Sequence, residues 1–195
     1  MHGMINRAIE RFVRDTYGRN AWGLITARAE LDFAEFEAML SYDDHVTEDV
    51  LGAACDVLNK PREALLEDIG TYLVSHPNVE ALRRLLRFGG VDFHEFLHSL
   101  DDLPERARLA VPDLTLPDME LREHGATTYS LICRGGHPGF GHVITGLLRT
   151  MADDYGALVL LEHKGRREAS EIIEVHLMTS AHAAGRAFEL SVGAA

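Results

Sequence analysis

The sequence is poor in cysteine and in positive charge, and it has no long hydrophobic run. Only two cysteines, Cys55 and Cys133, occur among 195 residues, and both lie in apolar segments. We therefore expect buried, reduced thiols and a reducing cytoplasm. No apolar run reaches the roughly 20 residues that a membrane-spanning helix needs, and no signal-peptide core follows Met1, so we expect a soluble protein without a membrane partner. A formal charge of -12 repels phosphate backbones, so we expect no nucleic-acid partner either.

Hydrophobic residues make up 46% of the chain, which is enough for one well-cored domain. In residues 4–103 the apolar side chains lie three and four positions apart, as in Ile5, Ile9 and Phe12, and this spacing predicts a helical bundle. The predicted helices cover residues 4–17, 31–40, 47–58, 61–75, 78–87 and 91–103. From Pro104 onward prolines recur that can neither continue a helix nor lie in a central strand, so we place a boundary between residues 103 and 104.

Residues 104–180 predict a small antiparallel sheet with one crossing helix. The predicted strands cover residues 119–123, 128–133, 157–163 and 170–178. Between the second and third strands, residues 139–155 carry one apolar stripe and end at Gly156, which predicts a helix. The predicted fold class is therefore α+β, with the helical half first and the sheet second. Residues 181–195 are rich in small side chains and are expected to form a tail, in which residues 188–192 could add an edge strand.

The segment His94-Glu95-Phe96-Leu97-His98 matches H-E-x-x-H, in which two histidines one helical turn apart bind zinc and the glutamate is a general base. Both histidines, however, project about 120° to 160° from the centre of the apolar stripe of their predicted helix. That stripe comprises Phe93, Phe96, Leu97, Leu100 and Leu103. A catalytic zinc also needs a third protein ligand, and Glu120 and Glu123 lie on a predicted strand beyond three prolines. We therefore expect a solvated helix face, and keep a zinc hydrolase using His94, Glu95 and His98 as the alternative from another class.

Several short motifs occur along the chain in the order and spacing of one known family. They are Met1-His2-Gly3-Met4-Ile5, Tyr17-Gly18, Ala21-Trp22, Ser41-Tyr42-Asp43-Asp44, Leu58-Asn59-Lys60-Pro61, Leu100-Asp101-Asp102-Leu103, Pro112 with Pro117, Gly139-Phe140 and Asp154-Tyr155-Gly156. Each motif is weak alone, but together they show that residues 1 to about 180 resemble the haem nitric oxide/oxygen binding (H-NOX) sensor family. The resemblance implies a helical bundle and a small sheet around a haem, which one axial histidine on the last bundle helix holds. It also implies signalling to a kinase or a cyclic-nucleotide enzyme.

The sequence departs from that family where the haem is bound. Pro104 stands at the position of the axial histidine, and proline has no side-chain donor for iron. The family's Tyr-x-Ser-x-Arg motif, which binds the haem propionates, falls on Cys133, Gly135 and His137. Sliding the register to use Arg134 leaves the motif broken, so Arg134 and His137 are candidate anion contacts only.

The sequence therefore predicts a non-enzymatic sensory or regulatory domain that keeps an apolar ligand pocket. We expect no cofactor, and keep haem with a different iron ligand, in a sensor of the nitric oxide type, as the alternative. An apolar small molecule is a further candidate occupant. The predicted pocket residues are Ile5, Ile9, Phe96, Leu100, Pro104, Pro117, Val143 and Leu147.

Overall fold

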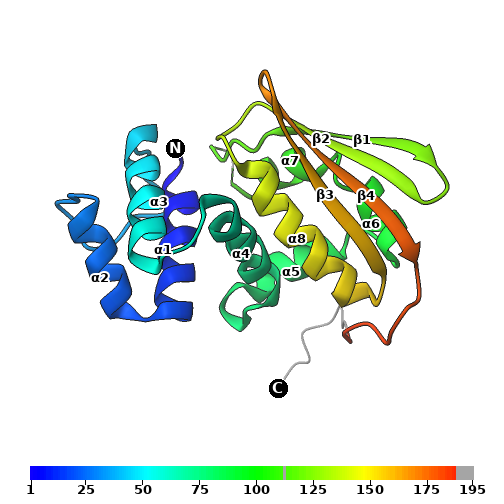
Figure 1. Ribbon diagram of the computed structural model, residues 1–195, viewed down its shortest axis with the longest axis horizontal. Coiled ribbons are helices and arrows are strands. Elements are labelled where there is room, and N and C mark those ends of the chain that lie inside the picture. The colour runs from blue at the N-terminus through cyan, green and yellow to red at the C-terminus, as the bar shows by residue number, and fades with distance from the viewer. Residues whose placement is uncertain (112, 188–195) are drawn as a thin grey trace.

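The computed structural model describes residues 1–111 and 113–187 (Figure 1). The helices in this part of the chain are α1 (Gly3–Tyr17), α2 (Arg19–Arg28), α3 (Asp44–Leu58), α4 (Arg62–Ser75), a 3-10 turn η1 (Pro77–Val79), α5 (Glu80–Arg87), α6 (Phe93–His98), α7 (Leu103–Ala110) and α8 (Phe140–Tyr155). The strands are β1 (Asp118–Gly125), β2 (Thr128–Arg134), β3 (Leu158–Arg167) and β4 (Ser170–Thr179). The α+β class and the order of a helical half followed by a sheet are confirmed. Among the described residues, no helix combines the length and the apolar character needed to cross a bilayer.

The predicted helix at residues 31–40 is wrong, because this segment is a coil of turns and bends. The spacing of its apolar residues resembles that of a helix, but these residues make packing contacts within a coil. The rings of Phe33 and Phe36 pack edge to face, with centroids 5.0 Å apart. Glu10 accepts a hydrogen bond from the backbone of Phe36, and Trp22 donates its indole N–H to the carbonyl of Ala34. These contacts fasten the coil to α1 and α2.

The predicted helix at residues 91–103 is divided in two by turns at residues 99–102, and α7 begins beyond them. Pro104 lies in the first turn of α7, where its missing N–H costs no hydrogen bond. The helical half therefore extends past the boundary predicted at residue 103.

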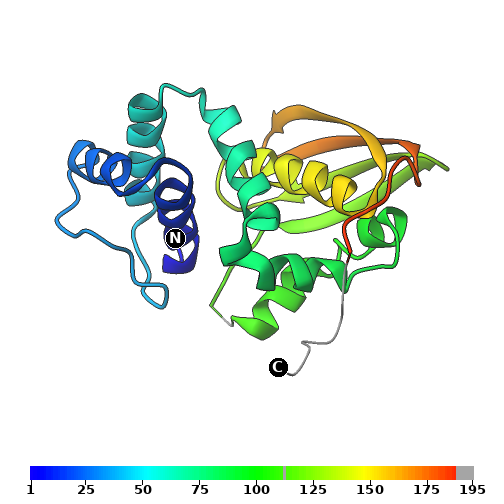
Figure 2. The same cartoon turned by 90° about the horizontal axis from the view of Figure 1, so that it is seen from below.

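The four strands form one antiparallel sheet in the order β1-β2-β4-β3. As Figure 2 shows, α8 lies against one face of this sheet, whereas α1, α2 and α3 lie away from it, beyond α4. Buried residues alternate along β4 and point toward α8, as in Ile173 and Val175. The predicted sheet with one crossing helix is confirmed. Of the predicted tail, residues 181–187 lie against the end of α8, where the N–H of Arg186 donates to the carbonyl of Asp154, while residues 188–192 lie outside the described residues.

Helices α4 and α8 cross at two glycines. A Cβ atom on Gly70 would overlap the backbone carbonyl of Val143, and one on Gly146 would overlap that of Glu67. The two helices join two hydrophobic cores, one among α1, α2, α3 and α4 and the other between α8 and the sheet. In both views α1, α2 and α3 lie on one side of α4, and α8 with the sheet lies on the other.

Candidate functional site

An apolar cavity of about 320 Å³ lies between the two cores. This volume is at the lower end of the roughly 300–1,000 Å³ typical of small-molecule sites. Its walls come from α1, α3, α4, α5, α7, α8 and the segment that joins α7 to β1. The apolar side chains that line it include Met4, Ile5, Ile9, Leu66, Ile69, Leu73, Leu86, Leu103, Ala107, Leu116, Met119, Phe140, Val143, Ile144 and Leu147. A largely apolar lining favours an apolar occupant, since polar atoms would lose their hydration without gaining hydrogen bonds.

The structure places five of the eight predicted pocket residues on the wall of this cavity, namely Ile5, Ile9, Pro117, Val143 and Leu147. The other three, Phe96, Leu100 and Pro104, are buried but do not line it. Phe96 and Leu100 belong instead to the core beneath the sheet. Helix α7 is a separate helix that begins at Leu103. Leu103 and Ala107, which lie one helical turn apart on it, face the cavity. Sequence periodicity missed these two residues because it continued one helix across the turns that precede Leu103.

His137 carries the only ionisable side chain among the described lining residues. Its Nε2 lies 2.8 Å from a carboxylate oxygen of Glu48, and its Nδ1 lies 3.2 Å from the carbonyl oxygen of Pro138. Both neighbours are hydrogen-bond acceptors, so contacts within the protein engage both ring nitrogens of His137. Glu48 also binds Arg62, at 2.8 Å, which fixes the carboxylate.

Arg134, the second candidate anion contact, does not line the cavity. Its guanidinium forms an ion pair with Glu120 on the neighbouring strand β1. Cys133, at the first position of the broken motif, is buried on β2, and burial, with a smaller contribution from Glu171, raises the pKa of its thiol to about 12. The structure therefore leaves His137 as the only one of these three side chains beside the cavity.

A histidine-ligated haem does not fit these residues. No lining residue in the described part of the chain offers a free imidazole, and none carries a guanidinium or an ammonium side chain for the propionates. The neighbouring polar cleft, which shares Thr115 and His137 with the cavity, is lined by the carboxylates of Asp44, Glu48 and Asp113. The cationic partners of two of these carboxylates are engaged within the protein, because the Met1 ammonium pairs with Asp44 and Arg62 pairs with Glu48.

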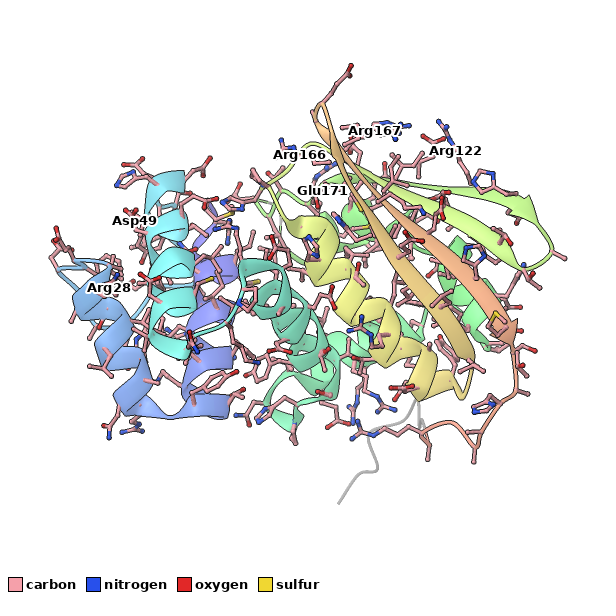
Figure 3. The ribbon with its side chains drawn as sticks, viewed as in Figure 1. Arg28, Asp49, Arg122, Arg166, Arg167 and Glu171 are labelled. Carbon is pink, nitrogen blue, oxygen red and sulfur yellow. The ribbon has the colours of Figure 1, made fainter. Side chains whose placement is uncertain are left out.

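A second polar pocket lies at the start of α8, where Figure 3 labels Glu171. The carboxylate of Glu171 accepts hydrogen bonds of 2.7 Å from the backbone N–H groups of Gly139 and Gly141 and lies 3.2 Å from His163 Nε2. Burial raises the pKa of Glu171, but these contacts lower it more, so its pKa lies below the ordinary value. The carboxylate of Glu171 thus supplies the negative charge that stabilises the N-terminus of α8.

The H-E-x-x-H segment lies on α6, with His94 and His98 exposed as helical phase predicts. One carboxylate oxygen of Glu95 accepts a hydrogen bond of 3.0 Å from the backbone N–H of Val91, so this side chain caps its own helix start. The expectation that no third ligand approaches is wrong: Glu123 on β1 lies 2.8 Å from His98 Nε2. Strand register, which sequence periodicity does not provide, brings this carboxylate to the helix.

Comparison with known proteins agrees with this architecture. Soluble guanylate cyclase gcy-31 from Caenorhabditis elegans is 25% identical over 154 residues, which are 79% of this chain and 22% of that protein. Soluble guanylate cyclase 89Db from Drosophila melanogaster is 20% identical over 81% of this chain and 24% of its own length. The chain thus spans about a quarter of the length of these curated relatives.

Solved structures share the fold. The Fe(II) unliganded H-NOX protein from K. algicida superposes with a TM-score of 0.78 at 17% identity, over 92% of this chain and 97% of that one. An H-NOX protein variant from S. oneidensis in the Fe(II) state gives a TM-score of 0.78 at 16% identity, with the same coverage. The sequence model of the haem-NO-binding family matches residues 2–163. With this match over most of its length, the chain belongs to the haem-NO-binding family.

Proposed function

We propose that this non-enzymatic sensory domain binds an uncharged apolar small molecule in its cavity in place of histidine-ligated haem. The observation that carries the proposal is the lining of the cavity, in which the described side chains are apolar except for those of Thr47, Thr115 and His137. An occupant contacts both hydrophobic cores at once, since Ile9 and Leu66 belong to one core and Leu103 and Leu147 to the other. Binding can therefore shift how the two cores pack, provided that the occupant contacts one arrangement better than another.

An absorption spectrum of the full chain, expressed with added haem precursor and then incubated with haemin, tests the cofactor. We expect no Soret band at a stoichiometry of one haem per chain. A band at that stoichiometry, retained through gel filtration, would overturn the haem-free proposal.

A fluorescence titration with the uncharged probe N-phenylnaphthylamine tests the cavity. We expect saturable binding that Ala107→Phe weakens at least about tenfold, because the new ring occupies the space. Ala107 lines the cavity, whereas Leu109 on the same helix is 86% exposed. Leu109→Phe is therefore the matched control and should leave affinity unchanged. Equal affinity of both variants would show that the probe binds elsewhere.

Haem held by a different ligand is the second candidate, because Met4 and Met119 both line the cavity. Methionine thioethers are known axial ligands of haem iron. The same spectrum decides, since a thioether-bound haem would give a Soret band that Met4→Leu or Met119→Leu removes.

We also propose that the domain regulates a signalling enzyme of the kinase or cyclic-nucleotide class. The proposal is supported by the guanylate cyclase relatives, about a quarter of whose length this chain matches. Co-purification of the full chain with such an enzyme tests this proposal. The amount of enzyme recovered should change when the cavity is occupied.

A further inference from the structure

Three metal-ligating side chains meet where α6 packs against β1, outside the apolar cavity. His94 and His98 come from successive turns of α6, and Glu123 comes from β1. Each offers one ligand atom, and these atoms all lie within 4.8 Å of one another. All three side chains are exposed, so a hydrated ion can reach them from solvent.

The sheet holds both imidazoles in position. The ring of Tyr129 is fully buried and contacts both of them edge to face, with centroid distances of 5.9 Å to His94 and 6.3 Å to His98. Tyr129 is also the cross-strand partner of Glu123 in the β1–β2 register. One buried ring thus lies beneath the three candidate ligands and limits the rotamers that they can adopt.

The three side chains have ligand capacity to spare. Within the described residues, His94 makes ring contacts but no hydrogen bond through its ring nitrogens, and Nε2 of His98 lies 2.8 Å from a carboxylate oxygen of Glu123. In a tetrahedral site with bonds of about 2.0–2.1 Å, ligand atoms lie roughly 3.3 Å apart. Small side-chain rotations are therefore enough to convert the present cluster into a coordination shell.

We propose that His94, His98 and Glu123 bind one Zn²⁺ or a similar first-row divalent cation. Two imidazole nitrogens and one carboxylate oxygen match the ligand preference of such ions, whereas Ca²⁺ and Mg²⁺ prefer oxygen alone. Water completes the shell. The formal charge of -12 raises the local cation concentration, and Asp92 adds a negative charge near Tyr129.

The site binds metal without being hydrolytic. One oxygen of Glu95 accepts a hydrogen bond from the backbone of Val91, and none of the three ligands lines the apolar cavity or either polar pocket described above. The ion instead links α6 to β1, beside the hydrogen bond of 2.7 Å from the N–H of Leu121 to Asp101. This link lies just before α7, whose Leu103 forms part of the cavity wall.

Calorimetric titration of the untagged, chelator-treated full chain with Zn²⁺ tests the proposal. We expect one ion per chain, with affinity reduced at least about tenfold by His94→Ala, by His98→Ala and by Glu123→Gln. His182→Ala removes an exposed histidine elsewhere and should leave binding unchanged. Because all the replaced side chains are exposed, circular dichroism should show the same fold in every variant.

A titration with Co²⁺ adds a readout of geometry, since visible bands of high intensity accompany tetrahedral coordination. We expect these bands in the parent chain and in His182→Ala, and their loss in His94→Ala and His98→Ala. No saturable binding, or binding that survives both histidine variants, would overturn the site. An unchanged zinc affinity in Glu123→Gln would overturn the assignment of three protein ligands. None of these results depends on what the apolar cavity holds.

Discussion

At the scale of single residues, Pro104 marks where the structure departs from the helix that sequence periodicity predicted. From the sequence, Pro104 is predicted to be a pocket residue, and the structure shows that this residue is buried. It is not on the cavity wall, because the chain turns at residues 99–102 and α7 starts afresh. Leu103 and Ala107 face the cavity instead. Pro104 thus lies in the first turn of the helix that supplies this wall.

Replacing Pro104 by histidine should restore at most partial haem uptake. The imidazole adds one ligand, but no guanidinium or ammonium side chain among the described lining residues is available for the propionates. The measurement is Soret absorbance per chain after incubation with haemin, with Leu109→His on the exposed face of α7 as control. Full and stable occupancy of Pro104→His would contradict this expectation.

Glu171 makes a residue-scale contribution to stability that depends on pH. Its pKa is lower in the folded chain than its ordinary value of 4.5, so its stabilisation is fully present above that value and is lost as pH falls through the folded pKa. We expect Glu171→Gln to lower the free energy of unfolding at neutral pH by about 1–3 kcal/mol, with the difference shrinking below about pH 4. Urea unfolding at several pH values measures it.

The control for that series is Glu162→Gln, since Glu162 is 59% exposed on β3. Its effect should stay within about 0.5 kcal/mol at neutral pH. A Glu171→Gln effect that grows toward acid would contradict the sign of the argument.

At the scale of helices and strands, the crossing of α4 and α8 depends on close backbone approach. Gly70 and Gly146 allow the two backbones to touch, and any Cβ there meets a carbonyl of the other helix. Sequence periodicity predicted both helices correctly. It did not predict this contact, because a glycine inside a helical pattern carries no signal about what approaches it.

Substitution of Gly146 by alanine should destabilise the protein by about 1–3 kcal/mol or more, since α8 must move away from α4. A Cβ atom on Gly52 in α3 would meet no neighbouring side chain or helix within 4 Å, so Gly52→Ala is the matched control. That control should gain about 0.5–1 kcal/mol from helix propensity alone. Thermal unfolding of the two variants should therefore shift in opposite directions, and a shared direction would refute the close-packing argument.

The prediction of helices from the sequence failed at residues 31–40 and at α2, where the spacing of apolar residues does not follow the local structure. The coil at residues 31–40 has aromatic residues three apart, but tertiary contacts of Phe33 and Phe36 hold it without a helix. The missed helix α2 buries only Trp22 and Ile25, too few to produce a periodic signal. Strands were easier to predict, since β4 alternates buried and less buried residues over most of its length.

At the scale of the whole molecule, the cavity lies where two separately packed cores meet. Helix α1 belongs to one core, and Leu103 of α7 belongs to the other. Both helices line the cavity. An occupant should therefore slow amide exchange in α1 and α7 together. Hydrogen–deuterium exchange with and without N-phenylnaphthylamine measures this, with Ala107→Phe as the variant that should lose the effect. Protection limited to one core would contradict a shared site.

The sequence alone determined the family, the α+β class and the order of most elements, because these depend on residue identity and local periodicity. Tertiary structure alone decided that Leu103 and Ala107 face the cavity, that Glu48 engages His137, and that Glu123 meets His98. Those facts depend on where helices stop and on the register between strands. Packing between segments far apart in the chain sets both features. No single position of the sequence shows which distant segment will pack against it.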